Sequence, residues 1–153
     1  MEKFRRELER FSRIALDTSI FIYHFEAHAL YHPLTEEIFR GVESGVWKAV
    51  TSTITLIELT VQPYQLHRPD IAQKYEALLA NFPNLTIQDI HRDVARQAAQ
   101  IRAQYGLRVP DAIQVATGLY AGAEAFVSND MHFKPLAQLT NILILDEYRS
   151  PHR

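Results

Sequence analysis

Apolar residues recur along this chain with two different periods, one typical of buried strands and one typical of amphipathic helices. Short apolar runs closed by polar turn residues predict five strands, at 14–17, 47–51, 84–90, 124–130 and 141–146. Spacings of three and four residues predict helices at 2–12, 21–25, 34–42, 52–60, 71–82 and 91–105, and Pro110 as the N1 residue of a further helix. Strands that alternate with helices indicate an open, parallel α/β sheet with helices on both faces.

The predicted helix at 52–60 contains an unusual carboxylate. Glu58 is the only formally charged side chain between Lys48 and His67. Ile54, Ile57, Glu58 and Val61 share one helical face, so we expect Glu58 to point in the same direction as these apolar residues. Burial of a lone carboxylate is costly, and therefore a compensating partner is expected.

Composition narrows the classes of function. Sixteen Lys and Arg against eighteen Asp and Glu give a net charge of −2, so charge alone does not favour binding of nucleic acid. The absence of cysteine excludes a disulfide, a thiolate nucleophile and a cysteine zinc site. The charged N-terminal stretch and the lack of a long apolar run predict a cytoplasmic protein with no membrane association. We expect one domain over residues 1–153, with an N-terminal helical extension at 1–13 and a polar tail at 147–153.

Three further acids occupy positions where a helix cap or a turn would explain them individually. Asp17 ends a predicted strand, Asp111 follows Pro110 at a helix start, and Asp130 ends the Ser-Asn-Asp turn after a strand. Functional groups of open α/β sheets collect beyond the carboxyl ends of the strands, so these acids and Glu58 could meet there.

Such a cluster of carboxylates requires cations. Two unit charges about 4 Å apart repel by about 4 kcal/mol at an effective dielectric of 20. Two divalent ions would cancel four negative charges, and oxygen ligands favour Mg²⁺ or Mn²⁺. Metal ions held by carboxylates, with open positions for water and phosphate, suit phosphodiester hydrolysis.

Four segments together resemble the acidic motifs of PIN domains, and most closely those of VapC-like toxin ribonucleases of type II toxin-antitoxin modules. They are LDTSIFIY (16–23), TSTITLIELTVQP (51–63), LRVPDAIQVATGLYAGAEAF (107–126) and VSND (127–130). The resemblance runs in the family's order from Ile14 to Asp146, whereas the segment before Ile14 departs from it. It implies a three-layer α/β/α sandwich with a five-stranded parallel sheet of order 3-2-1-4-5.

The resemblance also implies a function, a metal-dependent RNA endonuclease that uses Mg²⁺ or Mn²⁺. The family's acids fall on Asp17, Glu58, Asp111 and Asp130, as metal ligands and catalytic residues, with Thr18 and Asn129 as polar neighbours. The implied partners are an RNA substrate and a small antitoxin protein. The residues alone leave open a DNA nuclease, a phosphatase, a housekeeping RNA-processing enzyme or an inactive binding module.

Other groups of residues have weaker functional interpretations. Arg92, Arg96, Arg102 and Arg108 are candidate RNA contacts, although a solvated face would explain them equally well. Tyr23, Phe25 and Tyr31 could stack on bases or dock a partner, and His24, His28 and His32 could line a zinc site, but core packing and a solvated helix end explain these sets better. Phe4, Leu8 and Phe11 predict that the N-terminal helix covers the chain's own core or a homodimer's core, in preference to docking a partner.

Overall fold

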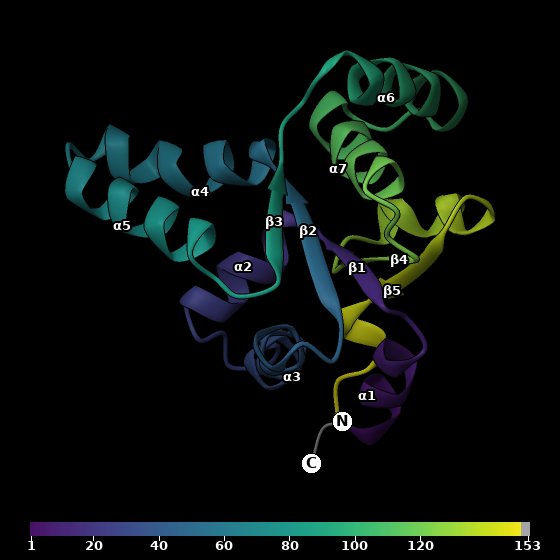
Figure 1. Ribbon diagram of the computed structural model, residues 1–153, viewed down its shortest axis with the longest axis horizontal. Helices are drawn as coiled ribbons and strands as arrows, with labels where there is room; N and C mark the ends of the chain where they lie inside the picture. Colours follow the sequence, from purple (N-terminus) through teal and green to yellow (C-terminus); the bar gives the residue numbers. More distant parts are fainter. Residues whose placement is uncertain (151–153) are drawn as a thin grey trace.

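The computed structural model describes residues 1–150, which form a parallel sheet between two layers of helices (Figure 1). The strands are β1 Arg13–Leu16, β2 Lys48–Ser52, β3 Leu85–Gln88, β4 Ala125–Ser128 and β5 Asn141–Ile144. All neighbouring strands pair in parallel, in the order β3-β2-β1-β4-β5. The α/β/α class and the strand order expected from the resemblance are both confirmed.

Helices connect the strands as the apolar spacing predicts. They are α1 Glu2–Glu9, α2 Thr18–Phe25, α3 His32–Ser44, α4 Thr53–Gln65, α5 Pro69–Ala80, α6 Arg92–Tyr105 and α7 Val109–Tyr120, with 3₁₀ helices η1 Met131–Gln138 and η2 Leu145–Glu147. Several boundaries differ from expectation by a few residues, as at the end of α1, which is Glu9 rather than residue 12. Helix α4 continues through Pro63 to Gln65, and α7 begins at Val109, so Pro110 is its second residue.

Alternating strand residues supply two separate cores. Ile14 and Leu16 of β1 face a cluster built with α1, α2 and α3, whereas Ala15 between them faces a cluster built with α6, α7 and η1. The same alternation holds in β4, where Phe126 packs on Phe133 of η1. This period of two is the consequence of side chains pointing to opposite faces of a strand.

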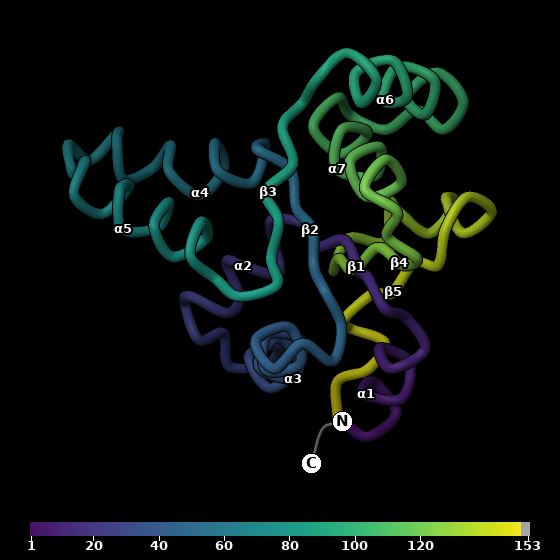
Figure 2. The backbone as a smooth tube through the Cα atoms, viewed as in Figure 1, coloured from purple at the N-terminus to yellow at the C-terminus, as the bar shows by residue number. Residues whose placement is uncertain are grey.

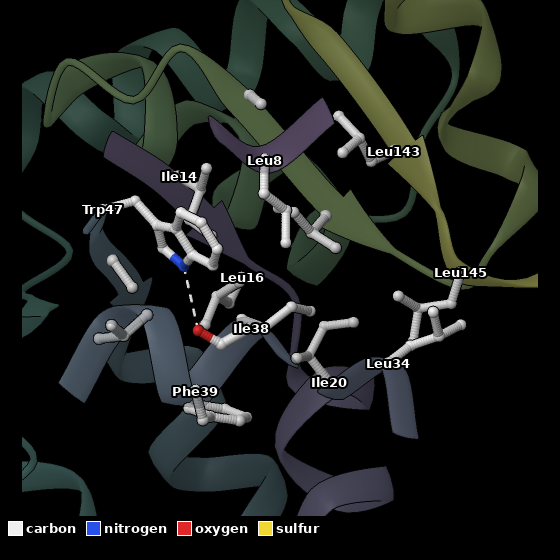
Figure 3. Packing of buried hydrophobic residues seen from close by; sticks show 14 of the residues in the cluster. Leu8, Ile14, Leu16, Ile20, Leu34, Ile38, Phe39, Trp47, Leu143 and Leu145 are labelled. Carbon is white, nitrogen blue, oxygen red and sulfur yellow. Dashed lines mark hydrogen bonds between the residues drawn. The ribbon is translucent and has the colours of Figure 1, made fainter. Parts of the chain in front are cut away.

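Trp47 is one of the buried residues of the first core (Figure 3). Its indole nitrogen donates a 3.0 Å hydrogen bond to the carbonyl oxygen of Ile38, which satisfies the one polar group of this buried side chain. The ring lies against Gly41 of α3, where an added Cβ would approach Trp47 Cζ2 to 2.0 Å. A glycine is therefore required at this position by the close contact with the indole.

The N-terminal helix covers the chain's own core, as the sequence favours. Phe4 and Leu8 are completely buried, and the ring of Phe4 packs on that of Tyr148, 5.0 Å between centroids. The predicted polar tail thus includes one residue that contributes to the core, and its last residues, 151–153, lie outside the described part. Between residues 1 and 150, no helix has the length and hydropathy needed to cross a membrane.

The path of the chain explains why chemistry can collect at one edge of the sheet (Figure 2). Because all strands are parallel, their carboxyl ends lie along the same edge. Helices α2 and α4 follow β1 and β2 directly at this edge, and the turn after β4 ends there.

Candidate functional site

Two of the four predicted acids lie directly beyond strand ends. Asp17 follows the last residue of β1, and Asp130 stands two residues after Ser128, the last residue of β4. Strands β1 and β4 are neighbours in the sheet, so the two positions are adjacent. Glu58 lies in α4 and Asp111 in the first turn of α7.

Asp17 is the most strongly perturbed carboxyl of the site. Its Oδ1 accepts a hydrogen bond from the Thr18 backbone N–H (2.9 Å), and its Oδ2 accepts from the hydroxyls of Ser128 (2.7 Å) and Ser19 (3.3 Å). Burial raises the pKa of Asp17 to about 6, and the negative charges of Asp111 and Glu58 add to the rise, against the opposing effect of these hydrogen bonds. The hydrogen-bond partners of Asp17 are neutral donors, so no cation contacts this carboxyl directly.

Glu58 reaches the site through a hydrogen bond with Thr18. The Thr18 hydroxyl lies 2.7 Å from Glu58 Oε1 and donates to it. Thr18 is buried at the start of α2, so its hydroxyl has a fixed position and orients the Glu58 carboxylate. In this way a residue adjacent to Asp17 in sequence also orients the acid contributed by α4.

The orientation of Thr18 depends on a buried network centred on Gln114. The Gln114 amide nitrogen donates to the hydroxyls of Thr18 and Thr55, each at 2.9 Å. Thr55 lies 2.7 Å from Thr51, whose hydroxyl donates to the Leu16 carbonyl. Glu58 and the Leu16 carbonyl can only accept hydrogen bonds. The Thr18 hydroxyl therefore donates to Glu58, the Thr55 hydroxyl donates to Thr51, and the Thr51 hydroxyl donates to the carbonyl. Sequence reasoning missed Gln114, although its spacing of three from Asp111 within an apolar run is a visible signal.

Asp111 is paired with an arginine of its own loop. Arg108 Nε donates to Asp111 Oδ2 at 3.0 Å, and Arg108 Nη2 lies 3.5 Å from Oδ1. The Arg108 side chain is 76% exposed and that of Asp111 only 15%. The negative charges of Asp130 and Glu58 also raise the pKa of Arg108, so its guanidinium lies on the same acidic surface.

Asp130 both caps η1 and faces the site. Its Oδ1 accepts from the His132 backbone N–H (2.9 Å), and it lies 2.7 Å from His132 Nδ1. Burial by itself would raise the pKa of Asp130, but these hydrogen bonds and the charges of His132 and Arg108 outweigh it and lower the pKa. The carboxylate is thus ionised more readily than that of Asp17.

Asn129 links neighbouring elements. Its amide nitrogen donates to the Tyr23 hydroxyl (3.3 Å), and its Oδ1 accepts from the Asp146 backbone N–H (2.8 Å). Tyr31 in turn donates to Asp146 at 2.7 Å, and its ring packs on Tyr23. These aromatic residues therefore brace the end of β5 against α2.

The expected burial of Glu58 is wrong. Ile57 is 59% exposed, Val61 is 47% exposed and Glu58 itself is exposed, whereas the buried residues of α4 include Thr55 and Leu59. The apolar face read from the sequence is thus a largely exposed surface. The need for a partner arises instead from the clustering of the acids.

A groove of about 280 Å³ adjoins Glu58. Its walls come from α2, α4, α5 and the turn between α4 and α5, and the last two helices lie side by side in Figure 1. Phe25 and Tyr75 stack within it, with ring centroids 5.6 Å apart and an interplanar angle of 9°. Leu66, on the same wall, is exposed. A groove with mostly apolar walls, lined also by Glu26, Glu58 and Arg68, is typical of a surface that binds another molecule.

Most of the arginines and histidines that the sequence singles out lie away from the acids of the site. Arg96 pairs with Asp93, and Arg102 donates to the Leu107 carbonyl, so only Arg108 of the four candidate arginines is recorded in contact with an acid of the site. Arg92 lies at the exposed start of α6. The rings of His24 and His32 stack at 5.2 Å, but no three His, Asp or Glu side chains between residues 1 and 150 lie in an arrangement that could hold a metal ion as it stands.

The acidic set nevertheless fits a hard divalent ion. Every donor atom that it offers is a carboxylate oxygen, the ligand type that Mg²⁺ and Mn²⁺ prefer. Burial is the main cause of the raised pKa of Asp17, and the like charges of Asp111 and Glu58 add a smaller contribution, which a cation would offset.

Comparison with known proteins identifies the family. A model of the PIN domain family matches residues 14–139, most of the chain. A search of curated proteins found no match.

Solved structures share the fold at low sequence identity. A toxin-antitoxin complex from Klebsiella pneumoniae matches with 23% identity and a TM-score of 0.64, over 85% of this chain and 95% of that one. DNA-bound VapBC from Salmonella typhimurium matches with 19% identity and a TM-score of 0.67, over 87% and 98%. FitAcB from Neisseria gonorrhoeae matches with 18% identity and a TM-score of 0.61, over 85% and 96%. With the family model spanning residues 14–139, the chain belongs to the PIN domain family of nucleases.

Proposed function

We propose that this protein is a metal-dependent endoribonuclease that holds Mg²⁺ or Mn²⁺ with Asp17, Glu58, Asp111 and Asp130. The observation that supports the proposal is the position of Asp17, whose pKa is raised to about 6 mainly by burial and to a smaller extent by the charges of Asp111 and Glu58 nearby. A divalent ion would offset the repulsion between these acids and could activate a water for phosphodiester hydrolysis. Membership of the PIN family supports the nuclease class.

The chain's own residues then prepare the site. The Thr18 N–H and the Ser128 hydroxyl fix both oxygens of Asp17, and the Thr18 hydroxyl fixes Glu58. His132 holds Asp130 in its ionised form. When bound, the metal supplies a water activated for in-line attack on a phosphodiester, which leaves 3′-hydroxyl and 5′-phosphate ends.

We further propose that the nuclease is the toxin of a toxin-antitoxin pair in the cytoplasm. Structures of toxin-antitoxin complexes share its fold. The groove beside Glu58 and the exposed apolar residues of α4 offer a surface for a small antitoxin protein next to the acids. An arginine from such a protein would pair with the carboxylates and compete with metal for them.

Cleavage assays with the purified protein test the nuclease proposal. Labelled single-stranded RNA, and DNA of the same sequence, are incubated with Mn²⁺ or Mg²⁺ and with EDTA. The proposal predicts endonucleolytic cleavage of RNA that EDTA abolishes. Cleavage that is equal with chelator would refute metal dependence, and preferential cleavage of DNA would refute the substrate class.

Expression in the source cell tests the toxin role. Growth arrest that is relieved by co-expression of the protein encoded next to this gene would support it. If expression causes no arrest, or if the neighbouring product gives no relief, the toxin role fails and a housekeeping RNA-processing nuclease replaces it. The Asp17→Asn variant is the control, because it should fold and yet cause no arrest.

A further inference from the structure

Arg108 is unusual among the arginines of this chain because its partner is an acid of the proposed metal site. Its guanidinium contacts Asp111 and lies within reach of the charges of Asp130 and Glu58. Arg108 thus pairs with one acid of the site, and the charges of two others act on it. A metal ion that binds Asp111 would leave this guanidinium without its present partner.

The backbone at Arg108 is fixed, whereas its side chain is not. Leu107, the preceding residue, is buried, and its carbonyl accepts a 2.6 Å hydrogen bond from Arg102. Arg108 itself is the N-cap residue of α7 and has extended backbone angles. Only the long side chain, 76% exposed, is free to change partner.

The pair between Arg108 and Asp111 is weak enough to exchange. Ion pairs with an exposed partner contribute only about 0.2–1 kcal/mol. A divalent ion bound by Asp111 would repel the guanidinium and occupy the oxygens that it now contacts. The phosphate of a bound nucleic acid would then be a suitable partner for the displaced guanidinium, because arginine binds phosphate bidentately.

We propose that Arg108 binds the scissile phosphate, and that it exchanges Asp111 for this phosphate when metal occupies the site. The inference rests on the proposed nuclease function and assigns a further catalytic residue to it. In the metal-free protein Arg108 thus competes with metal for Asp111, and in the loaded protein it stabilises the charge of the reacting phosphate.

The variants Arg108→Gln and Arg108→Lys test the proposal, with Arg40→Gln as a matched control. The first half of the proposal is the competition with metal for Asp111, and the second half is the contact with the scissile phosphate. Arg40 is also exposed and also paired with an acid of its own helix, Glu36, but it lies on α3. Circular dichroism and thermal melting establish that all three variants fold. Calorimetric titration with Mn²⁺, without nucleic acid, measures the first half.

Arg108→Gln should bind Mn²⁺ about two- to fivefold more tightly than wild type, which is the range expected for loss of one exposed ion pair. Arg40→Gln should be unchanged. An affinity of Arg108→Gln for Mn²⁺ that equals or falls below that of wild type would overturn the exchange.

Kinetics at saturating Mn²⁺ measure the second half. A group that contacts the reacting phosphate should lower kcat by about 10²- to 10³-fold when it is removed, with a smaller change in KM. Arg108→Lys should recover part of the loss. A change confined to KM, or a kcat within twofold of that of Arg40→Gln, would refute the contact with the scissile phosphate.

Failure of the proposed function gives a different pattern. If wild type cleaves no RNA in Mn²⁺, the nuclease proposal fails, while the Mn²⁺ titration still decides the exchange at Asp111. Binding of the same uncleaved RNA to Mn²⁺-loaded protein then decides the phosphate contact. Equal RNA binding by wild type and Arg108→Gln would overturn it.

Discussion

Replacement of Asp17 by asparagine should stabilise the metal-free protein at neutral pH. The pKa of Asp17 rises from 3.8 to about 6 on folding because burial and the neighbouring acids disfavour the ionised form. Below pH 3.8 both the folded and the unfolded states are protonated, and this carboxyl has no effect on stability. Between pH 4 and 6 the unfolded state loses its proton first, so the free energy of unfolding falls as the pH rises.

The size of the effect follows from these two pKa values. A pKa difference of about two corresponds, at 1.36 kcal/mol for each pKa unit, to a loss of about 3 kcal/mol in the free energy of unfolding above pH 6. Asparagine avoids this loss, but its amide nitrogen cannot accept the hydrogen bond that Ser128 donates to Oδ2 at 2.7 Å, at a cost of about 1 kcal/mol. The net gain at pH 7.5 is therefore about 1–2 kcal/mol, or about 3–6 °C in Tm for a chain of this length.

Thermal melting in EDTA at pH 4 and at pH 7.5 measures the difference. Asp17→Asn should melt above wild type at pH 7.5 and at or below it at pH 4. Asp70→Asn is the control of opposite sign, because the hydrogen bond from Arg68 lowers the pKa of Asp70 and favours its ionised form in the folded state. A Tm of Asp17→Asn that is equal to or below that of wild type at pH 7.5 would refute the reasoning.

Three other substitutions test separate parts of the structure. Gln114→Met should lower the free energy of unfolding by about 1–3 kcal/mol in a denaturant titration, because two buried hydroxyls lose their donor; an unchanged midpoint would show that the network is not stabilising. Gly41→Ala should cost at least about 1–3 kcal/mol in the same titration, because its Cβ would overlap Trp47, and wild-type stability would contradict that packing. The double variant Ile57→Ser, Val61→Ser should keep wild-type stability within about 0.5 kcal/mol because both side chains are largely exposed, and it should bind the proposed antitoxin partner more weakly in calorimetry; unchanged affinity would place that partner elsewhere.

The sequence predicts the elements of this fold well because strand and helix periods alternate cleanly. Asp17 and Asp130 are located correctly because apolar strand residues immediately precede the turns that carry them. The strand order required the family resemblance, since periodicity does not determine which strands are neighbours. The helix η1 was not predicted, because Pro135 lies inside it and its spacing matches neither period.

The errors at the site have a physical cause as well. Periodicity places Ile57 and Val61 on one face with Glu58, but it cannot distinguish an apolar face that packs on the core from one that remains exposed. The Gln114 network joins residues far apart in the sequence, so only the folded chain brings them together. The contact of Arg108 with Asp111 spans only three residues, yet the sequence does not distinguish it from the other arginines of the same region.

The central claim is that the four acids form a metal-dependent site for cutting RNA. The most direct measurement is the rate of RNA cleavage by wild type and by Asp111→Asn, side by side at saturating Mn²⁺, with melting curves to establish that both proteins are folded. The account predicts cleavage by wild type and a rate reduced by orders of magnitude in Asp111→Asn. A folded Asp111→Asn protein that cleaves RNA at the wild-type rate would contradict it.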